Sequence, residues 1–415
     1  MSIEKIDEQI KKVKKASEKI SCANSEEKSR FLDNLAKLLD KNRKKIIEEN
    51  RIDIEQGRKT LSKAKIDRLM INDERISKII ESVETIKKIE DPVGRIESGK
   101  RLPNGLILIK KRIPIGLILI IYESRPNVTI DAASLSLKAG NGVILKGGKE
   151  AINTNRILAK LLKEALSLAQ IDENAVYFVD TTSRKATEKL LKMDNLIDLV
   201  IPRGGSSLIK YVSENSRIPV VKHDKGLCHI YVDSFANLTM AKKIVYNAKV
   251  SRPGVCNAIE TLLVHSDIVE KFLPEMAREL ISAGVRLIGC EKTARIIDIK
   301  PADEDDWFTE YLDLTLSIKI VESIEEAIEH INYYGSHHSD GIVTDNFSNA
   351  TKFTDMVDSA AVYVNASTRF TDGGEFGMGA EIGISTNRLH ARGPMGADEL
   401  TTYKYILIGN GQIRN

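Results

Sequence analysis

Apolar residues recur at helical spacing from Ile3 to about Ile89, while lysines and glutamates cover the other faces. One apolar stripe consists of Phe31, Leu32, Leu35, Leu38 and Leu39. This pattern predicts a helical entry segment. The lysines alone would suit a nucleic-acid surface, but the acidic residues interleaved with them favour a solvated helix face.

The pattern changes between Gly94 and Gly116, where turn-forming residues break up short apolar stretches. These residues are Gly99, Pro103, Asn104, Gly105 and Pro114. Glycine, proline and asparagine in this arrangement are typical of hairpins. We therefore expect a projecting β arm.

Two regions that alternate apolar runs with helical patterns follow the arm. In the first, the expected strands are 117–122, 143–145, 175–179, 196–201 and 218–221. The second starts near Leu227, with apolar runs at 230–232, 258–264 and 285–288 between helical stretches at 236–250 and 268–283. Alternation of this kind predicts two α/β lobes, each built on a largely parallel sheet with helices on both faces. After a glycine-rich stretch at 372–396, residues 403–408 resume a strand pattern.

The composition is that of a folded protein that binds small molecules. The 415 residues are enough for two or three domains, with 42% apolar and 29% charged residues. The 62 Lys and Arg against 59 Asp and Glu leave a net charge of +3, which argues against nucleic-acid and membrane partners. Four cysteines without a CxxC pair, and no signal-peptide core or long apolar run, predict a cytoplasmic protein.

Cys256 is the candidate nucleophile. It lies in the segment SRPGVCN at 251–257, where Pro-Gly bends the chain just before an apolar strand. A thiol at such a bend can face a cleft, and a thiolate is the strongest nucleophile among ordinary side chains. The same residue type is more often buried and inert, and this is our interpretation of Cys22, Cys228 and Cys290.

Two strand ends carry residues suited to a nucleotide, although the GxGxxG fingerprint is absent. Gly204, Gly205 and Ser206 follow an apolar strand and lead into a helix, where free N–H groups and the helix dipole can hold phosphate. A glycine pair also occurs where a chain merely turns. Lys146 to Lys149 follow the preceding strand, and ligands collect at the carboxyl ends of a doubly wound sheet.

The seven histidines form no metal-binding pattern, because no HExxH motif occurs and His337 and His338 are adjacent. We expect no metal. His223 follows an apolar strand, where an imidazole could serve acid–base chemistry, although a surface histidine without a role fits the same position.

Four segments point to a known family. They are IYESRPNV at 121–128, GNGVILKGG at 140–148, SRPGVCN at 251–257 and VNASTRFTDGGEFG at 364–377. Together they resemble the gamma-glutamyl phosphate reductase family of the aldehyde dehydrogenase superfamily, and the resemblance runs from about residue 5 to Gly409.

The resemblance implies an α/β fold of the aldehyde dehydrogenase type, with two doubly wound α/β domains and a small β oligomerisation arm. We place the cofactor-binding domain at 1–233, interrupted by the arm at about 94–116. The catalytic domain with Cys256 then covers 234–385, and a C-terminal segment at 386–415 supplies an oligomerisation strand.

The implied reaction is the NADPH-dependent reduction of L-glutamyl 5-phosphate to L-glutamate 5-semialdehyde and phosphate, through a cysteine thioester. This is the second step of proline biosynthesis from glutamate. The family also implies a homo-oligomer, dimer or tetramer, and leaves open an association with glutamate 5-kinase, which makes the unstable substrate.

The catalytic and substrate-binding residues carry over by position. Cys256 corresponds to the catalytic cysteine, Asn127 is the best candidate for a side-chain oxyanion donor, and His223 for the general acid. The substrate's phosphate and α-carboxylate need cations, for which the candidates are Arg125, Arg252 and Arg369.

The cofactor residues carry over in the same way. Lys146 matches the lysine that holds the adenosine ribose. Lys149 stands where NAD-dependent relatives often place a glutamate, and this favours NADP(H) because a lysine attracts a 2′-phosphate. The turn near the pyrophosphate corresponds to Gly204, Gly205 and Ser206, and the glutamate near the nicotinamide ribose to Glu310.

One departure from the superfamily pattern bears on the reaction. Hydrolytic aldehyde dehydrogenases carry a general-base glutamate, and the equivalent stretch at 222–227 reads KHDKGL here, without one. An enzyme that exchanges its acyl group with phosphate should lack that base. Two alternatives stay open: a thiol enzyme that oxidises a free aldehyde to an acid, and a non-catalytic protein that has kept the fold.

Overall fold

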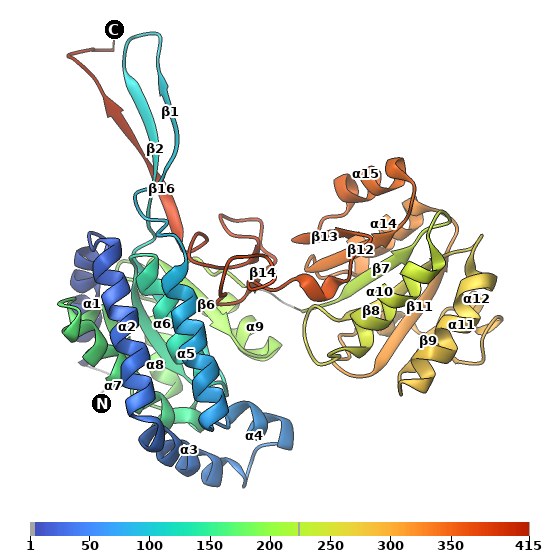
Figure 1. The fold of residues 1–415 in the computed structure, drawn as a ribbon, viewed down its shortest axis with the longest axis horizontal. Coiled ribbons are helices and arrows are strands. Elements are labelled where there is room, and N and C mark those ends of the chain that lie inside the picture. Colours follow the sequence, from blue (N-terminus) through green and yellow to red (C-terminus); the bar gives the residue numbers. More distant parts are fainter. Residues whose placement is uncertain (1–4, 223–224, 415) are drawn as a thin grey trace.

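The computed structural model describes residues 5–222 and 225–414, which form two α/β lobes and a projecting arm (Figure 1). The chain crosses between the lobes twice, once before β7 and once after β13. The α/β class, with two lobes on parallel sheets and a β arm, is confirmed as predicted from the sequence.

The first lobe holds a four-stranded parallel sheet in the order β5-β4-β3-β6. Its strands are β3 (Leu117–Tyr122), β4 (Gly142–Gly147), β5 (Val176–Phe178) and β6 (Leu199–Arg203). Its helices are α1 (Lys5–Ile20), α2 (Ser25–Lys41), α3 (Arg43–Gly57), α4 (Lys63–Leu69), α5 (Asp73–Lys88), α6 (Asn127–Lys138), α7 (Ile152–Leu168), α8 (Arg184–Leu190) and α9 (Ser206–Asn215), with 3₁₀ turns η1 (Lys149–Ala151) and η2 (Glu173–Ala175).

Both faces of this sheet are covered, which explains why every residue of β3 is apolar and buried. Ile118 and Ile120 pack into one core with α2, α5, α6 and α7. Leu117 and Leu119 point to the opposite face and pack with α1, α8 and α9. The helical entry segment predicted from the spacing thus forms α1 to α5, and α2 begins with a capping box in which Asn24 accepts from the Glu27 N–H.

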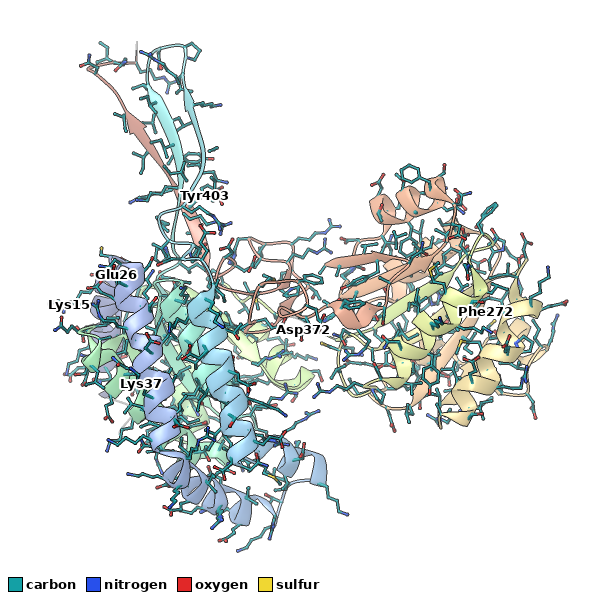
Figure 2. The ribbon with its side chains drawn as sticks, in the orientation of Figure 1. Lys15, Glu26, Lys37, Phe272, Asp372 and Tyr403 are labelled. Atoms are coloured by element: carbon teal, nitrogen blue, oxygen red, sulfur yellow. The ribbon has the colours of Figure 1, made fainter. Side chains whose placement is uncertain are left out.

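The second lobe holds a seven-stranded parallel sheet in the order β10-β9-β11-β8-β7-β12-β13. Its strands are β7 (Cys228–Val232), β8 (Ile259–His265), β9 (Arg286–Gly289), β10 (Lys300–Pro301), β11 (Thr315–Val321), β12 (Ser339–Val343) and β13 (Ala361–Val364). Its helices are α10 (Leu238–Val250), α11 (Val269–Ser282), α12 (Glu291–Ala294), α13 (Glu304–Trp307), α14 (Ile324–Tyr334) and α15 (Phe347–Met356). Phe272 on α11 belongs to the core of this lobe (Figure 2).

The arm is a three-stranded antiparallel sheet of β1 (Ile96–Arg101), β2 (Ile107–Pro114) and β16 (Thr401–Ile408). Tyr403 lies near its base in Figure 2. The last strand of the chain therefore pairs with a hairpin nearly three hundred residues earlier in the sequence, as Ile408 faces Ile107 in the register.

Two of the expected domain boundaries differ from the structure. We expected the second domain to begin at 234, but β7 (Cys228–Val232) already lies inside the seven-stranded sheet, between β8 and β12. We expected that domain to end at 385, but Ile382 already packs into the core of the first lobe, together with Ala391 and Met395. The returning segment, with η3 (Thr368–Phe370), β14 (Ile384–Ser385) and β15 (Gly393–Pro394), thus runs from the second lobe back to the first. No helix in the described part of the chain is long and apolar enough to cross a membrane.

Candidate active site

Cys256 lies in the loop between α10 and β8, at the amino end of β8. Because β7 and β8 are parallel neighbours with Cys228 opposite Ile259, the residues just before the two strands also come together. A Cβ atom at Gly226 would lie 2.1 Å from the Cys256 carbonyl oxygen, so only glycine fits there. The buried Cys228 thiol donates to the same carbonyl at 3.1 Å. The backbone of Cys256, the candidate nucleophile, is therefore held from the neighbouring strand.

Charged groups from both lobes act on the Cys256 thiol. Its side chain is partly exposed, and partial burial raises its pKa above the ordinary value. The positive charge of Arg203, at the end of β6, lowers the pKa, whereas Glu381 and Glu310 raise it. A reactive thiolate at this place consequently depends on nearby cations.

Four arginines gather around this thiol from separate segments: Arg125 after β3, Arg203 at the end of β6, Arg252 in the loop 251–258 that carries Cys256, and Arg369 in η3. Loss of water contact and then the charges of neighbouring arginines lower the pKa of Arg125 to about 10, although part of its side chain stays exposed. Within residues 5–222 and 225–414, none of the four guanidinium groups has a carboxylate within 4.0 Å. The cluster is a positive site without direct ion pairs, although Asp372 acts on Arg369 and Glu381 interacts with Arg203 from further away.

The sheet topology explains why Arg125 and Arg203 meet. From β3 the chain moves through β4 to β5 on one side, and β6 then pairs on the other side of β3. The sheet therefore has its switch point between β3 and β6, and ligands bind outside the carboxyl ends of strands at such a point. Arg125 and Arg203 follow directly from those two strand ends.

Arg369 is held against the loop 251–258 by hydrogen bonds. Its Nε donates to Ser251 Oγ at 3.1 Å. The Asn257 side chain donates to the Thr371 carbonyl at 2.9 Å, and Thr368 Oγ1 donates to the Asn257 carbonyl at 2.7 Å. Loss of water contact and the charge of Arg252 lower the pKa of Arg369. Asp372 follows in the chain that runs between the lobes (Figure 2).

Asn127 begins α6, and its amide is oriented by the half-buried carboxylate of Asp131. The Nδ2 group donates to Asp131 at 2.9 Å, and Asp131 also accepts from Ser82 at 2.9 Å. Burial raises the pKa of Asp131, while these hydrogen bonds and the charge of Arg203 oppose the rise. One amide hydrogen of Asn127 is engaged, and Nδ2 carries a second.

Glu310 is half-buried, and its charge acts on the Cys256 thiol. Its Oε1 accepts from the Gly226 N–H at 2.7 Å, and burial raises the pKa of its carboxyl. The neighbouring Lys225 donates to the Phe308 carbonyl at 3.2 Å, which ties the same two segments together a second time. His223 lies outside the described residues.

The predicted cofactor residues line the carboxyl ends of β4 and β6. Lys146 is buried, and its ammonium has only the Gly147 carbonyl at 3.2 Å among the described groups; desolvation lowers its pKa. Lys149 is exposed in η1. At the start of α9, the Gly205 N–H donates to the Glu123 carboxylate at 3.0 Å, so a negative charge already stands at this helix end.

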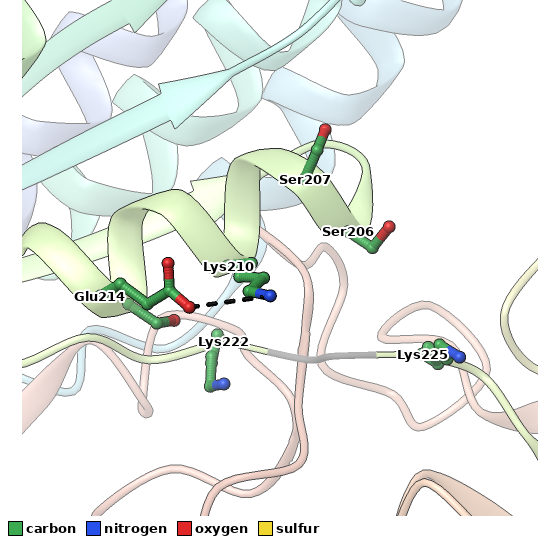
Figure 3. Close-up of a pocket in the computed structure, with 7 residues that line it drawn as sticks. Ser206, Ser207, Lys210, Glu214, Lys222 and Lys225 are labelled. Atoms are coloured by element: carbon green, nitrogen blue, oxygen red, sulfur yellow. Dashed lines mark ion pairs between the residues drawn. The ribbon is translucent and has the colours of Figure 1, made fainter. Parts of the chain in front are cut away.

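A hollow of about 430 Å³ lies beside α9 (Figure 3). It is lined by Ser206, Ser207, Lys210, Ser213, Glu214, Lys222 and Lys225. Ser206, from the predicted pyrophosphate turn, is one of the lining residues, and three lysines make the hollow basic.

Sequence reasoning missed Arg203 and Glu381. Arg203 stands directly before Gly204, and its place at a strand end of a doubly wound sheet was a usable signal. Glu381 accepts from the Gly373 N–H at 3.0 Å and comes from the returning segment. Nothing in the sequence near Glu381 links it to a thiol that is 125 positions away.

Comparison with known proteins places the molecule in a family. A family model described as "Aldehyde dehydrogenase family" matches residues 1–286, and the chain belongs to this family. It is an oxidoreductase that uses a nicotinamide cofactor.

Individual relatives show which enzymes of the family the chain is similar to. The chain is 54% identical over 411 residues to gamma-glutamyl phosphate reductase of Caldanaerobacter subterraneus subsp. tengcongensis, and the match covers 99% of each protein. The crystal structure of gamma-glutamyl phosphate reductase from Thermotoga maritima matches with a TM-score of 0.97 and 48% identity, over 98% of this chain and 99% of that one. The Saccharomyces cerevisiae enzyme of the same name matches with a TM-score of 0.55 and 31% identity, over 98% of both chains. The resemblance seen in the four motifs is confirmed.

Proposed function

We propose that this protein reduces L-glutamyl 5-phosphate to L-glutamate 5-semialdehyde and phosphate with NADPH. The observation that carries the proposal is the set of four arginines without carboxylate partners around a partly exposed cysteine. A substrate with one phosphate and one carboxylate offers anions for such a cluster, and guanidinium groups bind both in two-pronged fashion.

The chain's own residues account for the acyl-transfer half of the reaction. The Cys256 thiolate attacks the acyl carbon and expels phosphate toward the arginines, which leaves a thioester. The oxyanion formed in this step is stabilised by the Cys256 backbone N–H and the free amide hydrogen of Asn127. His223 is the proposed general acid.

The cofactor residues fit a dinucleotide with an extra phosphate. The buried Lys146 ammonium lacks a carboxylate partner among the described residues, and Lys149 is exposed for a 2′-phosphate. A pyrophosphate at the start of α9 would have to displace the Glu123 carboxylate, which accepts the Gly205 N–H there. When bound, the reduced nicotinamide would supply a hydride to the thioester carbon. Cys256 would then leave as the thiolate when the semialdehyde is released.

Water is a poor acyl acceptor in this site. The two carboxylates that act on Cys256, Glu310 and Glu381, each accept a backbone N–H, from Gly226 and Gly373. Burial raises the pKa of both carboxyl groups in spite of these hydrogen bonds, so the argument against hydrolysis rests on the stretch 222–227, which lacks the general-base glutamate of hydrolytic relatives. This supports exchange of the acyl group with phosphate.

We place the enzyme in the cytoplasm as a homo-oligomer assembled through the arm. The described cysteines are all free, as in a reducing compartment. Alternate residues of β16 expose large side chains: Tyr403, Tyr405 and Leu407. These alternate residues share one face of an edge strand, and an apolar face of this kind is stable in water when another copy covers it. Association with glutamate 5-kinase stays a prediction.

The test uses the reverse reaction. Because the semialdehyde cyclises, NADPH formation is followed at several phosphate concentrations instead of aldehyde loss. We expect turnover that requires phosphate. Full activity without phosphate would show that the enzyme hydrolyses its thioester and would overturn the proposal.

A further inference from the structure

A buried ion pair brackets the nucleophile loop. Lys249 stands in the last turn of α10 and Glu260 near the start of β8, on either side of residues 251–258. Their side chains are 0% and 1% exposed, and Lys249 Nζ donates to Glu260 Oε2 at 2.6 Å and to the Ile259 carbonyl at 2.9 Å. The two ends of the loop that carries Cys256 are thereby joined.

The other oxygen of Glu260 reaches a different segment. Its Oε1 accepts from the Leu312 N–H at 3.1 Å. Leu312 has a φ of 52°, a left-handed conformation that is unfavourable for leucine, so contacts from the surroundings must hold the backbone there. Leu312 lies two residues after Glu310.

These contacts close a ring around the nucleophile. Glu310 accepts from the Gly226 N–H at 2.7 Å, and the Gly226 backbone packs directly on Cys256. The ring therefore runs from the Cys256 loop through the ion pair to Leu312, and from Glu310 through Gly226 back to Cys256.

Stability alone does not explain such a pair. The free energy needed to remove two charges from water can equal or exceed the free energy gained from their attraction. Replacing a buried ion pair with apolar side chains is therefore often neutral or stabilising. Burial raises the pKa of Glu260 to about 7, which shows how far this site disfavours the carboxylate. The pair is better explained as a device that fixes the position of the Cys256 loop and of the Leu312 backbone.

We propose that Lys249 and Glu260 are positioning residues: they fix the nucleophile loop and the Leu312 backbone together, and so set where Glu310 stands relative to Cys256. The inference rests on Cys256 as the nucleophile of the proposed function. Its main readout, alkylation of Cys256, requires no turnover, so the two can fail separately.

Two variants carry the test. K249M/E260M replaces the pair with apolar side chains of similar volume at no change in net charge. E260D keeps the charge pair with Lys249 but shortens the side chain that reaches Leu312 by one methylene. It serves as the test if K249M/E260M does not fold. For each, thermal unfolding, kcat, KM for NADPH and the pH midpoint of Cys256 alkylation by iodoacetamide are measured.

We expect folded variants whose kcat/KM is at least tenfold lower. Because the charge of Glu310 raises the thiol pKa, its displacement should lower the alkylation midpoint, and a shift of half a unit makes alkylation at pH 7 roughly threefold faster. The matched control is K28M/D91L, which removes a pair from the first lobe with 1% and 10% exposed side chains. It should change unfolding and leave kcat/KM and the midpoint within twofold of wild type.

Wild-type kcat/KM and alkylation midpoint in a folded E260D or K249M/E260M variant would overturn the inference. Equal losses in K28M/D91L would also overturn it, because they would show that removing any buried pair disturbs the site.

Discussion

The dependence of the Cys256 thiolate on one cation is the most direct consequence of the site's electrostatics. Arg203 is the strongest charge that lowers the Cys256 pKa, against partial burial and two carboxylates that raise it. Opposite charges close to a titrating group shift its pKa by roughly 1–3 units, and solvent in a partly open site reduces the effect. We therefore expect R203M to raise the thiol pKa by about one unit. Because each unit changes the thiolate fraction tenfold when the pKa exceeds the pH, alkylation at pH 7 should become about tenfold slower.

The assay is the rate of iodoacetamide reaction at Cys256 between pH 6 and 10, followed by mass spectrometry of the peptide that contains it. E381Q provides a test of opposite sign, since it removes a charge that raises the pKa and still offers an acceptor for the Gly373 N–H. The pH midpoint of Cys256 alkylation should therefore be lower in E381Q than in wild type. R156M, which removes an exposed arginine paired with Asp180, is the control and should leave the midpoint unchanged. An R203M midpoint at or below that of wild type would refute the reasoning.

Three further substitutions test other parts of the site. C256S should keep the fold and cofactor binding but lose more than nine-tenths of turnover, because an alcohol without a strong adjacent base is a poor nucleophile; higher residual activity in steady-state assays would remove Cys256 from the mechanism. K149E should move the ratio of kcat/KM for NADPH and NADH by about one to two decades toward NADH, as opposed charges at a partly solvated site are worth roughly 1–3 kcal/mol; an unchanged ratio would mean that Lys149 does not meet the 2′-phosphate. G226A should displace the Cys256 backbone, from which its Cβ would be 2.1 Å away, and lower kcat at least tenfold, whereas G99A, whose nearest neighbour is at 3.9 Å, should leave kcat and thermal unfolding near wild type.

Much of the scaffold follows from local sequence pattern. A strand such as LILIIY at 117–122 is apolar at every position because both faces of its sheet are buried. The apolar run predicts this burial even when the helices that cover the two faces are unknown. The five entry helices follow from apolar spacing in the same way, and the Pro-Gly bend before β8 already singled out Cys256. The spacing of apolar residues shows which side of a helix or strand is buried. The strand and the entry helices could be predicted because their burial depends only on that local spacing.

The electrostatics of the site and the limits of the lobes were decided by the tertiary structure. Arg203 lies in the first lobe and Cys256 in a loop of the second, and Glu381 comes from the returning segment, so no local pattern records that the charges of Arg203 and Glu381 act on this thiol. The close approach of Gly226 to Cys256 arises from the register of β7 and β8, which pairs residues about thirty positions apart. The same register draws β7 into the second lobe, ahead of the expected boundary. Charge interactions and backbone contacts depend on distance in space, and parallel strands connected by helices bring together residues whose separation in sequence gives no sign of it.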